Sequence, residues 1–272
     1  MTLAQWERDA VSRLDAAGAF DGATDAQLML CDALHISRGM LRILSEMEIP
    51  EDARGTLDAW LAERLTGRPL QYCEKVAWFY GRAFFVDERV LIPRFDTEIL
   101  CEEALKRYKN GMKVLDLCTG SGILAVTISL ERRTRVIAAD IDEGAMAVTR
   151  LNAEKLGADV ETRQGDLWDA VKDEVFDMIV CNPPYLTGED MENLQNEVTY
   201  EPKRALYGGE DGLSFYRRLA EGAKAHLAEN GMLLMEIGCL QGQTVSEIFN
   251  DYREVHILKD LQGLDRVVCC GK

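Results

Sequence analysis

Four consecutive residues, Asn182-Pro183-Pro184-Tyr185, follow the apolar run 176–181 and could hold a planar –NH2 group. The two prolines fix φ and lack an N–H, and each pushes the residue before it toward extended geometry, so the turn is stiff. The free acceptors of this turn are the Asn182 side-chain oxygen and the Pro183 carbonyl, and the Tyr185 ring could pack against a flat group. The alternative is a rigid turn with a purely structural role.

Two acceptors aimed at one –NH2 group suit the transfer of a methyl group to nitrogen. Amide and aryl-amine nitrogens are poor nucleophiles because their lone pair is delocalised, and the acceptors would orient the group and increase the electron density on nitrogen. Positioning of this kind can lower a barrier by up to about 7–11 kcal/mol. The motif therefore predicts catalytic roles for Asn182, Pro183 and Tyr185, with Pro184 joining them in substrate binding, but it does not specify whose –NH2 group is methylated.

A glycine turn predicts where the methyl donor binds. Gly120 and Gly122 separate a predicted strand from a predicted helix, and glycine lets the backbone turn sharply and approach a ligand closely. Asp140 ends the next strand, where a carboxylate can accept hydrogen bonds from both hydroxyls of a ribose. The turn is neither a phosphate loop nor a complete GxGxxG fingerprint, so a nucleoside without a pyrophosphate fits better, and S-adenosylmethionine is the expected donor. Asp166 and Leu167 could border its adenine ring or could belong to an ordinary loop.

An α/β fold is needed to position these residues. Strands are predicted at 113–117, 135–139, 160–163, 176–181, 232–237, 254–258 and 265–270, and helices at 96–108, 123–130, 143–156, 214–228 and 243–249. This alternation predicts an open, mostly parallel sheet with helices on both faces. Ligands bind to such sheets at the carboxyl ends of the strands, where the glycine turn, Asp140 and Asn182 all fall.

The first part of the chain has a different character. Apolar residues at helical spacing predict a small bundle of four or five helices over residues 1–70. Residues 71–93 are rich in aromatic, β-prone side chains and predict a β-hairpin linker that turns at Gly81. The expected domains are therefore a helical domain at 1–70, the linker at 71–93 and the sheet domain at 94–272.

Composition excludes several classes of protein. The 272 residues carry a net charge of −16, which disfavours a protein whose main task is to grip a phosphate backbone. No apolar run approaches the ~20 residues of a membrane span and the first residues do not resemble a signal peptide, so a cytoplasmic location is expected. The eight cysteines form no CxxC pair and only three histidines are present, so no metal site is expected.

Motifs along nearly the whole chain resemble those of the release-factor glutamine methyltransferases, the PrmC/HemK family. The central motifs, 116–122 and 182–185, are shared with other amino-methyltransferases, whereas the Pro-Arg…Thr-Glu and Glu-Pro…Ala-Leu segments are more specific to this family. The matching segments are 67–72, 90–94 with 96–98, 116–122, 182–185, 201–202 with 205–206, 208–209, 211–213 with 215–216, 236–238 with 241–242, and 265–268.

The resemblance implies a Rossmann-like, seven-stranded class I methyltransferase sheet with an antiparallel last strand, behind a small N-terminal helical-bundle domain that recognises the substrate. It implies S-adenosylmethionine as donor and, as acceptor, the glutamine of the Gly-Gly-Gln loop in peptide chain release factors. Cofactor contacts would come from Cys118, Thr119, Gly120, Ser121, Gly122, Asp140, Asp166, Leu167 and Asn182. We expect a monomer with no nucleic-acid or membrane partner.

This sequence departs from the family pattern in a few places. Cys118 stands where glycine is usual, and Lys75 and Trp78 replace residues that are more often glycine and glutamate. The segment 263–266 also differs slightly from the usual charged version.

Two other functions compete with this reading. An adenine-N6 methyltransferase acting on DNA or RNA would share the glycine turn and the Asn-Pro-Pro-Tyr motif, but the charge of −16 and the lack of an added basic recognition region argue against it. A non-catalytic donor-binding or ribosome-associated module would keep the glycine turn but would not need an intact Asn-Pro-Pro-Tyr motif.

Overall fold

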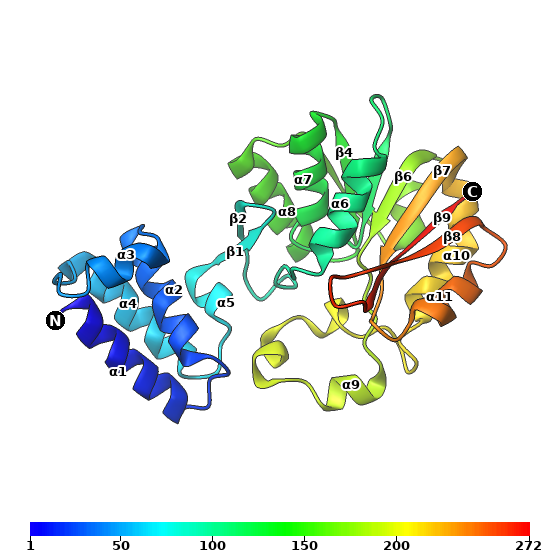
Figure 1. Ribbon diagram of the computed structural model, residues 1–272. Helices are drawn as coiled ribbons and strands as arrows, with labels where there is room; N and C mark the ends of the chain where they lie inside the picture. The colour runs from blue at the N-terminus through cyan, green and yellow to red at the C-terminus, as the bar shows by residue number, and fades with distance from the viewer. The chain divides into compact units, whose positions relative to one another are not determined.

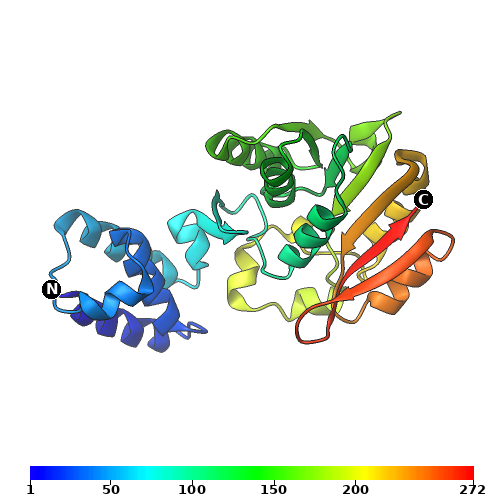
Figure 2. The same ribbon diagram turned by 45° about the horizontal axis from the view of Figure 1, so that its top comes forward.

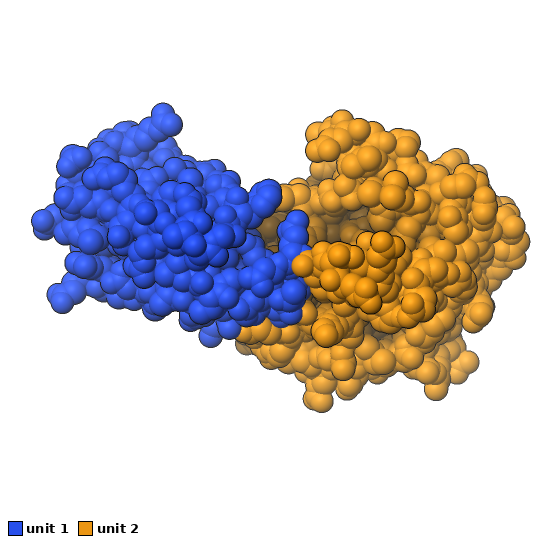
Figure 3. Space-filling model, turned by 90° about the horizontal axis from the view of Figure 1, so that it is seen from below, with its two compact units in different colours: residues 1–75, 195–200 blue, residues 76–194, 201–272 orange.

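The computed structural model describes all residues from 1 to 272, and the chain folds into two compact units (Figure 3). One unit consists of residues 1–75 together with 195–200, and the other of residues 76–194 and 201–272. A short segment that lies far along the sequence is therefore part of the N-terminal unit. None of the helices combines the length and the apolar character that a membrane span requires.

The N-terminal unit is a helical bundle. Its helices are α1 (Leu3–Ala16), α2 (Gly22–Leu34), α3 (Arg38–Ile43), α4 (Glu51–Arg64) and α5 (Leu70–Glu74). The apolar faces of α1, α2 and α4 meet in one core that includes the fully buried Trp6, Met29 and Leu57. Thr2 caps α1 by accepting a hydrogen bond from the backbone of Gln5, which satisfies one of the free N–H groups of the first turn.

A buried arginine ties the segment 195–200 into this bundle. Arg64 at the end of α4 is only 3% exposed, and its guanidinium pairs both with Asp25 on α2 and with Glu197. The Tyr200 hydroxyl also donates to the backbone oxygen of Thr66 over 2.9 Å. Two carboxylates around one buried guanidinium satisfy its forked donors, which explains why this short segment belongs to the bundle.

The second unit is built on a seven-stranded sheet, as predicted (Figure 1). Its strands are β3 (Val114–Leu117), β4 (Val136–Asp140), β5 (Val160–Gln164), β6 (Phe176–Cys181), β7 (Leu227–Glu236), β8 (Arg253–Lys259) and β9 (Asp265–Gly271). They lie in the order β5-β4-β3-β6-β7-β9-β8. The first five strands in this order, from β5 to β7, are parallel to one another. The last strand of the chain, β9, runs antiparallel to both β7 and β8, as the resemblance implied.

Helices cover both faces of this sheet (Figures 1 and 2). One face packs against α6 (Thr97–Arg107), α7 (Ile123–Arg132) and α8 (Glu143–Leu156), and the other against α10 (Ser214–His226) and α11 (Gly242–Ile248). Successive residues of a strand point to opposite faces, so Met178 and Val180 of β6 join the first core, while Ile179 and Cys181 join the second. Strands buried on both faces explain the nearly continuous apolar runs in the sequence.

The predicted hairpin is present and belongs to the second unit. Strands β1 (Val76–Phe79) and β2 (Arg82–Phe85) pair antiparallel through a turn at Tyr80 and Gly81, both with positive φ. Positive φ at both central residues is characteristic of the two-residue hairpin turn whose twist matches the twist of the paired strands. The side chain of Asn152 on α8 pairs with both backbone groups of Phe85, which anchors the hairpin to the sheet unit.

The predicted boundary between α10 and β7 was wrong by several residues. The helix ends at His226 and the strand starts at Leu227, whereas the sequence predicted a helix to 228 and a strand from 232. Leu227 is fully buried and pairs with Phe176 of β6, so sheet pairing extends the strand past Gly231 at the expense of the helix. The connection from 186 to 213 also contains elements that were not predicted, namely α9 (Gly188–Glu192) and two 3-10 helices (Asn196–Tyr200 and Lys203–Ala205).

Candidate active site

A cavity of about 970 Å³ of empty space, its open mouth included, lies at the carboxyl ends of β3, β4 and β6. Its walls come from the glycine turn after β3, the residues after β4, the Asn-Pro-Pro-Tyr turn after β6, and the segments 89–97 and 202–205. The predicted residues in its lining are Cys118, Thr119, Gly120, Ser121, Asp140, Asp166, Leu167, Asn182 and Pro184. Gly122, Pro183 and Tyr185 are not part of the lining.

The glycine turn needs left-handed backbone at three positions. Cys118, Gly120 and Gly122 have φ of 56°, 56° and 83°. A Cβ atom on Gly120 would meet nothing within 4 Å, so the space beside this residue is open to a ligand. A Cβ atom on Gly122 would lie 2.9 Å from Cγ2 of Thr149, so this glycine allows α7 to pack closely against α8. Cys118 adopts a left-handed conformation that favours glycine. This explains why glycine is usual at this position in the family pattern, and the cysteine here must tolerate that conformation with a side chain.

Asp140 holds two turns of backbone at the cavity wall. Its Oδ2 accepts from the N–H of Gly120 and its Oδ1 from the N–H of Asp142, each over 3.0 Å. Burial raises the pKa of Asp140, and the two backbone donors oppose that rise. Each carboxylate oxygen has a second lone pair, so Asp140 can accept two further hydrogen bonds from a ligand.

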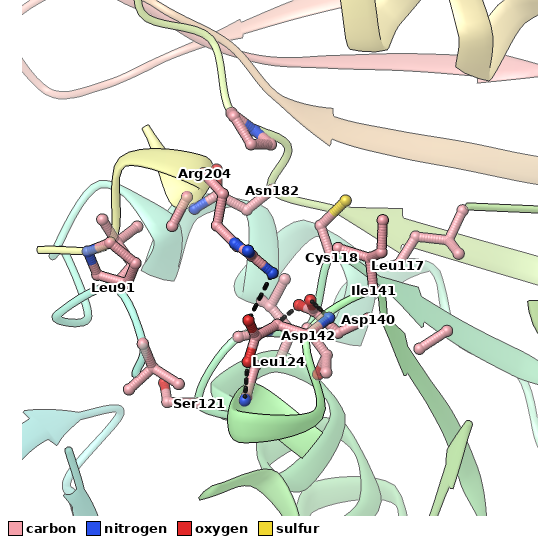
Figure 4. Close-up of a pocket in the computed structure, with 18 of the residues that line it drawn as sticks. Leu91, Leu117, Cys118, Ser121, Leu124, Asp140, Ile141, Asp142, Asn182 and Arg204 are labelled. Carbon is pink, nitrogen blue, oxygen red and sulfur yellow. Dashed lines mark hydrogen bonds and ion pairs between the residues drawn. The ribbon is translucent and has the colours of Figure 1, made fainter. Parts of the chain in front are cut away.

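Asp142 and Arg204 form an ion pair at the same cavity, and sequence analysis did not identify either residue. Arg204 reaches toward Asp142 in Figure 4, with Nη1 and Oδ2 2.6 Å apart. Asp142 also caps α8 by accepting from the N–H of Ala145. The sequence could have pointed to both residues by their positions alone. Asp142 lies two residues beyond Asp140, and Arg204 lies inside the Glu-Pro…Ala-Leu segment.

Asp166 and Leu167 lie where the sequence predicted, at the turn after β5. Leu167 is buried with a positive φ of 49°, whereas Asp166 pairs with Arg218 of α10 over 2.7 Å. Both residues face the cavity together with the ring of Phe215, which was not predicted. Leu167 and Phe215 give this part of the cavity an apolar lining, with one carboxylate at its edge.

The Asn-Pro-Pro-Tyr turn starts directly at the end of β6. Asn182 lines the cavity and donates from Nδ2 to Oγ1 of Thr97 on α6 over 3.2 Å. Neither Asn182 Oδ1 nor the Pro183 carbonyl accepts a hydrogen bond from another protein group. Thr97 is fully buried and was missed as a site residue, although it lies in the Pro-Arg…Thr-Glu segment.

The Tyr185 side chain points away from the cavity lining toward a buried carboxylate. Its hydroxyl lies 3.4 Å from Oε1 of Glu236 at the end of β7. Glu236 is fully buried, and burial raises its pKa to about 7, while Thr97, Tyr185 and Arg266 oppose the rise. The Gln241 side chain donates to the backbone oxygen of Tyr185 over 3.0 Å and so fixes the far end of the turn.

A second buried carboxylate fixes the opposite wall. Glu201 is 2% exposed, pairs with the guanidinium of Arg94 and accepts from the N–H of Ile92 over 3.1 Å. Burial raises the pKa of Glu201, whereas Arg94 and the Ile92 N–H lower it. Arg94 belongs to the Pro-Arg…Thr-Glu segment and Glu201 to the Glu-Pro…Ala-Leu segment. The two segments that are most specific to the PrmC/HemK pattern are therefore joined by an ion pair in the cavity wall.

Comparison with known proteins agrees with this geometry. Residues 94–210 match the family described as "Methyltransferase small domain", and residues 5–73 match the "PrmC N-terminal domain". The chain is 41% identical to the release factor glutamine methyltransferase of Neisseria gonorrhoeae, with 89% of this chain and 91% of that protein covered. It is 38% identical to that of Koribacter versatilis and 40% identical to that of Cereibacter sphaeroides, each over 98% of both chains. The chain belongs to the release factor glutamine methyltransferase family.

Solved structures support the fold of this family member. A methyltransferase from Pyrococcus furiosus superposes with a TM-score of 0.54 at 20% identity, covering 71% of this chain and 90% of that one. A 16S rRNA N2 G1207 methyltransferase from Thermus thermophilus, solved with AdoMet and guanosine, gives a TM-score of 0.52 at 18% identity, covering 72% of this chain and 49% of that one. At such identities these likenesses establish the methyltransferase fold alone.

Proposed function

We propose that this protein transfers a methyl group from S-adenosylmethionine to the side-chain amide nitrogen, N5, of the glutamine in the Gly-Gly-Gln motif of peptide chain release factors. One observation carries the proposal: Asn182, which begins a turn with two unoccupied acceptors, lines the same cavity as the glycine turn and Asp140. A site for a planar –NH2 group and a site for a nucleoside therefore adjoin. Membership in the release factor glutamine methyltransferase family identifies the acceptor as a protein glutamine.

The cavity residues fit the donor. Asp140 retains lone pairs for the two ribose hydroxyls, and the open space beside Gly120 admits a ligand against the backbone. The apolar side chains of Leu167 and Phe215 suit an adenine ring, with Asp166 at the edge. Cys118 to Ser121 would enclose the methionine part, whereas Gly122 contributes by packing α7 against α8.

The acceptor amide would be held by the Asn-Pro-Pro-Tyr turn. Asn182 Oδ1 and the Pro183 carbonyl would each accept one N–H of the glutamine, and Pro184 would border its flat face, while Tyr185 would hold the end of the turn through its contact with Glu236. When bound, the donor supplies an electrophilic methyl carbon on a positively charged sulfur. The two acceptors would orient the amide nitrogen toward that carbon and raise its electron density. As the carbon–nitrogen bond forms, the carbon–sulfur bond would break with its electron pair staying on sulfur, and the methylated nitrogen would then lose its proton to water.

Transfer of a labelled methyl group tests this function. The full-length protein would be incubated with labelled S-adenosylmethionine and, separately, with a release factor, with the same factor carrying alanine in place of the loop glutamine, and with adenine-containing DNA. We expect label only in the unaltered release factor. Label in the DNA would favour the alternative, an adenine-N6 methyltransferase, and equal label in both release factors would place the methyl group elsewhere.

We further propose that the helical domain, residues 1–70, recognises the release factor. The two most exposed large apolar side chains of this domain are Phe20 (91% exposed) and Ile43 (73% exposed). Deleting the domain would strip the buried partners from residues 195–200, so substitution is the cleaner test. Replacing both residues with serine should raise KM for the release factor and leave the affinity for S-adenosylmethionine unchanged. An unchanged KM would remove these two side chains from the recognition surface.

A further inference from the structure

The three most exposed large apolar side chains of the second unit lie at one edge of its sheet. They are Phe95, Leu240 and Leu261, each at least 81% exposed. Phe95 precedes α6, Leu240 follows β7, and Leu261 lies in the loop from β8 to β9 (Figure 1). Because β9 runs antiparallel to β7, the loop before β9 lies at the edge where β7 ends. A single exposed leucine is ordinary, but three such side chains that gather from distant segments indicate a surface with a task.

Arg266, near the start of β9, joins two of the segments that carry these side chains. Its Nη1 pairs with Asp96, the neighbour of Phe95, over 3.1 Å. Its Nε pairs with Asp260, the neighbour of Leu261, over 2.9 Å. One guanidinium therefore holds the segment before α6 beside the loop from β8 to β9.

The loop from β8 to β9 is held in one shape by the carboxylate of Asp260. Its Oδ1 accepts from the N–H groups of Gln262 and Leu264 over 2.8 and 2.9 Å. The N–H of Asp260 in turn donates to the backbone oxygen of Leu264 over 2.9 Å, which closes the loop. Leu261 is thus presented on a backbone that is already ordered, and this reduces the entropy lost when a partner covers it.

The turn that carries Leu240 is fixed to the Asn-Pro-Pro-Tyr turn. The side chain of Gln241, the next residue, donates to the backbone oxygen of Tyr185 over 3.0 Å. Phe95 lies in the segment 89–97, which forms part of the cavity wall. The exposed apolar side chains therefore stand beside the turn that would bind the acceptor amide.

We propose that Phe95, Leu240 and Leu261 form a docking surface, the acceptor rim, for the part of the release factor that surrounds its Gly-Gly-Gln loop. A glutamine side chain is short, so the polypeptide that carries it must come close to the Asn-Pro-Pro-Tyr turn before the amide can enter. The residues around that loop then cover the rim. This inference rests on the proposed function, because it takes the acceptor to be a glutamine in a protein.

The charges beside the rim suit a protein partner and not a nucleic acid. Lys259 and Arg266, the two basic residues at this end of β8 and β9, are both paired with acids, Lys259 with Asp265 and Arg266 with Asp260. A phosphate backbone is bound by basic side chains that are free to neutralise it. Exposed apolar side chains instead gain free energy when they are buried against apolar groups of another protein.

Serine at the rim positions removes the apolar surface without opening a cavity, since all three side chains are exposed. The test uses the three single variants Phe95→Ser, Leu240→Ser and Leu261→Ser, and the triple variant that combines them. Val175→Ser is the matched control. Val175 is also an exposed apolar residue, but it directly precedes β6 and so lies at the opposite edge of the sheet.

Binding of the full-length protein to a release factor, with S-adenosylhomocysteine present, is the first measurement because it needs no turnover. We expect the Kd of the release factor to rise at least about tenfold in the triple variant and less in each single variant. Val175→Ser should bind like the parent. A Kd for the triple variant within about twofold of the parent would overturn the inference, and so would an equal rise in Val175→Ser.

Steady-state methylation of the release factor is the second measurement. The KM of the factor should rise in the triple variant by about the same factor as its Kd, while kcat and the Kd of S-adenosylmethionine stay close to the parent, because the rim touches neither the donor nor the reacting atoms. A lower kcat with an unchanged KM would contradict a docking role.

Sedimentation of the parent and the triple variant identifies the other occupant that an apolar rim could have. A parent dimer that dissociates in the triple variant would show that the rim covers a second copy of this chain, and would overturn the inference. A parent protein that binds the release factor through the rim but does not methylate it would instead contradict the proposed function, which keeps the two failures distinct.

Discussion

The carboxylate of Asp140 accepts a hydrogen bond from the backbone N–H of Gly120 over 3.0 Å, so the acid that ends β4 also holds the glycine turn that follows β3. Its second oxygen holds the N–H of Asp142. One side chain therefore shapes two walls of the cavity before any ligand arrives. Its removal should affect the shape of the cavity as well as a ligand contact.

Replacing Asp140 with alanine should weaken donor binding. A hydrogen bond to a charged group contributes roughly 1.5–3 kcal/mol, so we expect the Kd of S-adenosylmethionine to rise at least about tenfold. Isothermal titration calorimetry of the full-length variant measures this. Asp159→Ala, an exposed acid on the same unit, is the control and should bind the donor like the parent. An unchanged titration for Asp140→Ala would remove this residue from the donor site.

Replacing Asn182 with alanine should abolish transfer while largely preserving donor binding. The variant loses one of the two acceptors that orient the substrate amide, and the loss of one such polar group typically lowers kcat by about 10²–10³. Asn193→Ala, at the exposed end of α9, is the control for the loss of an asparagine side chain. Turnover within threefold of the parent in Asn182→Ala would contradict the mechanism.

Breaking the buried pair between Arg94 and Glu201 should destabilise the sheet unit. Arg94→Met leaves the buried Glu201 carboxylate with the Ile92 N–H alone, and an uncompensated buried charge is costly. Because Arg94 is itself 38% exposed, we expect a loss of about 1–3 kcal/mol in the free energy of unfolding rather than the full cost of a buried pair. Urea denaturation measures it, with Arg217→Met as control, since Arg217 and Asp211 are both half exposed and should contribute little. Equal stabilities of the two variants would show that the Arg94 pair adds nothing.

Lys75→Gly should stabilise the protein. Lys75 ends α5 in the left-handed region with φ of 56° and its side chain is exposed, so the change removes backbone strain without removing packing. The expected gain in the free energy of unfolding is about 0.5–1 kcal/mol. Lys155→Gly, in the right-handed backbone of α8, should instead lose about 1 kcal/mol. Destabilisation by both changes would show that the left-handed position of Lys75 carries no strain.

The buried carboxyl of Glu236 should make stability depend on pH. Its pKa is about 7 in the folded protein against an ordinary value of 4.5, so the folded state binds more protons between these pH values. Binding this proton more tightly stabilises the folded state by about 3 kcal/mol in the free energy of unfolding. This stabilisation is present in full below about pH 4.5 and is lost as the pH rises through about 7. Urea denaturation at pH 5.0 and 7.5 should therefore show a smaller decline for Glu236→Gln than for the parent. The exposed Glu229→Gln is the control, and a decline in Glu236→Gln as large as in the parent would contradict the assignment.

Local sequence determined much of this protein. The stiffness of Asn182 to Tyr185, the sharp turn at Gly120 and the alternation of strands and helices all depend on residues adjacent in the chain. The sheet, the glycine turn and the placement of Asp140 and Asn182 at the ends of neighbouring parallel strands followed from these patterns, because strand ends in a parallel sheet lie at one edge. Family motifs then added the expected partner.

Only the tertiary structure decided which distant residues complete the site. Thr97, Glu236 and the pair of Arg94 with Glu201 come from segments up to 139 positions apart, and no periodicity links them. It also decided that Gly122 serves helix packing, that Tyr185 faces a buried carboxylate, and that β7 begins at Leu227. Such outcomes depend on which side chains meet across the sheet, because a buried polar group must find its partner wherever the fold brings one.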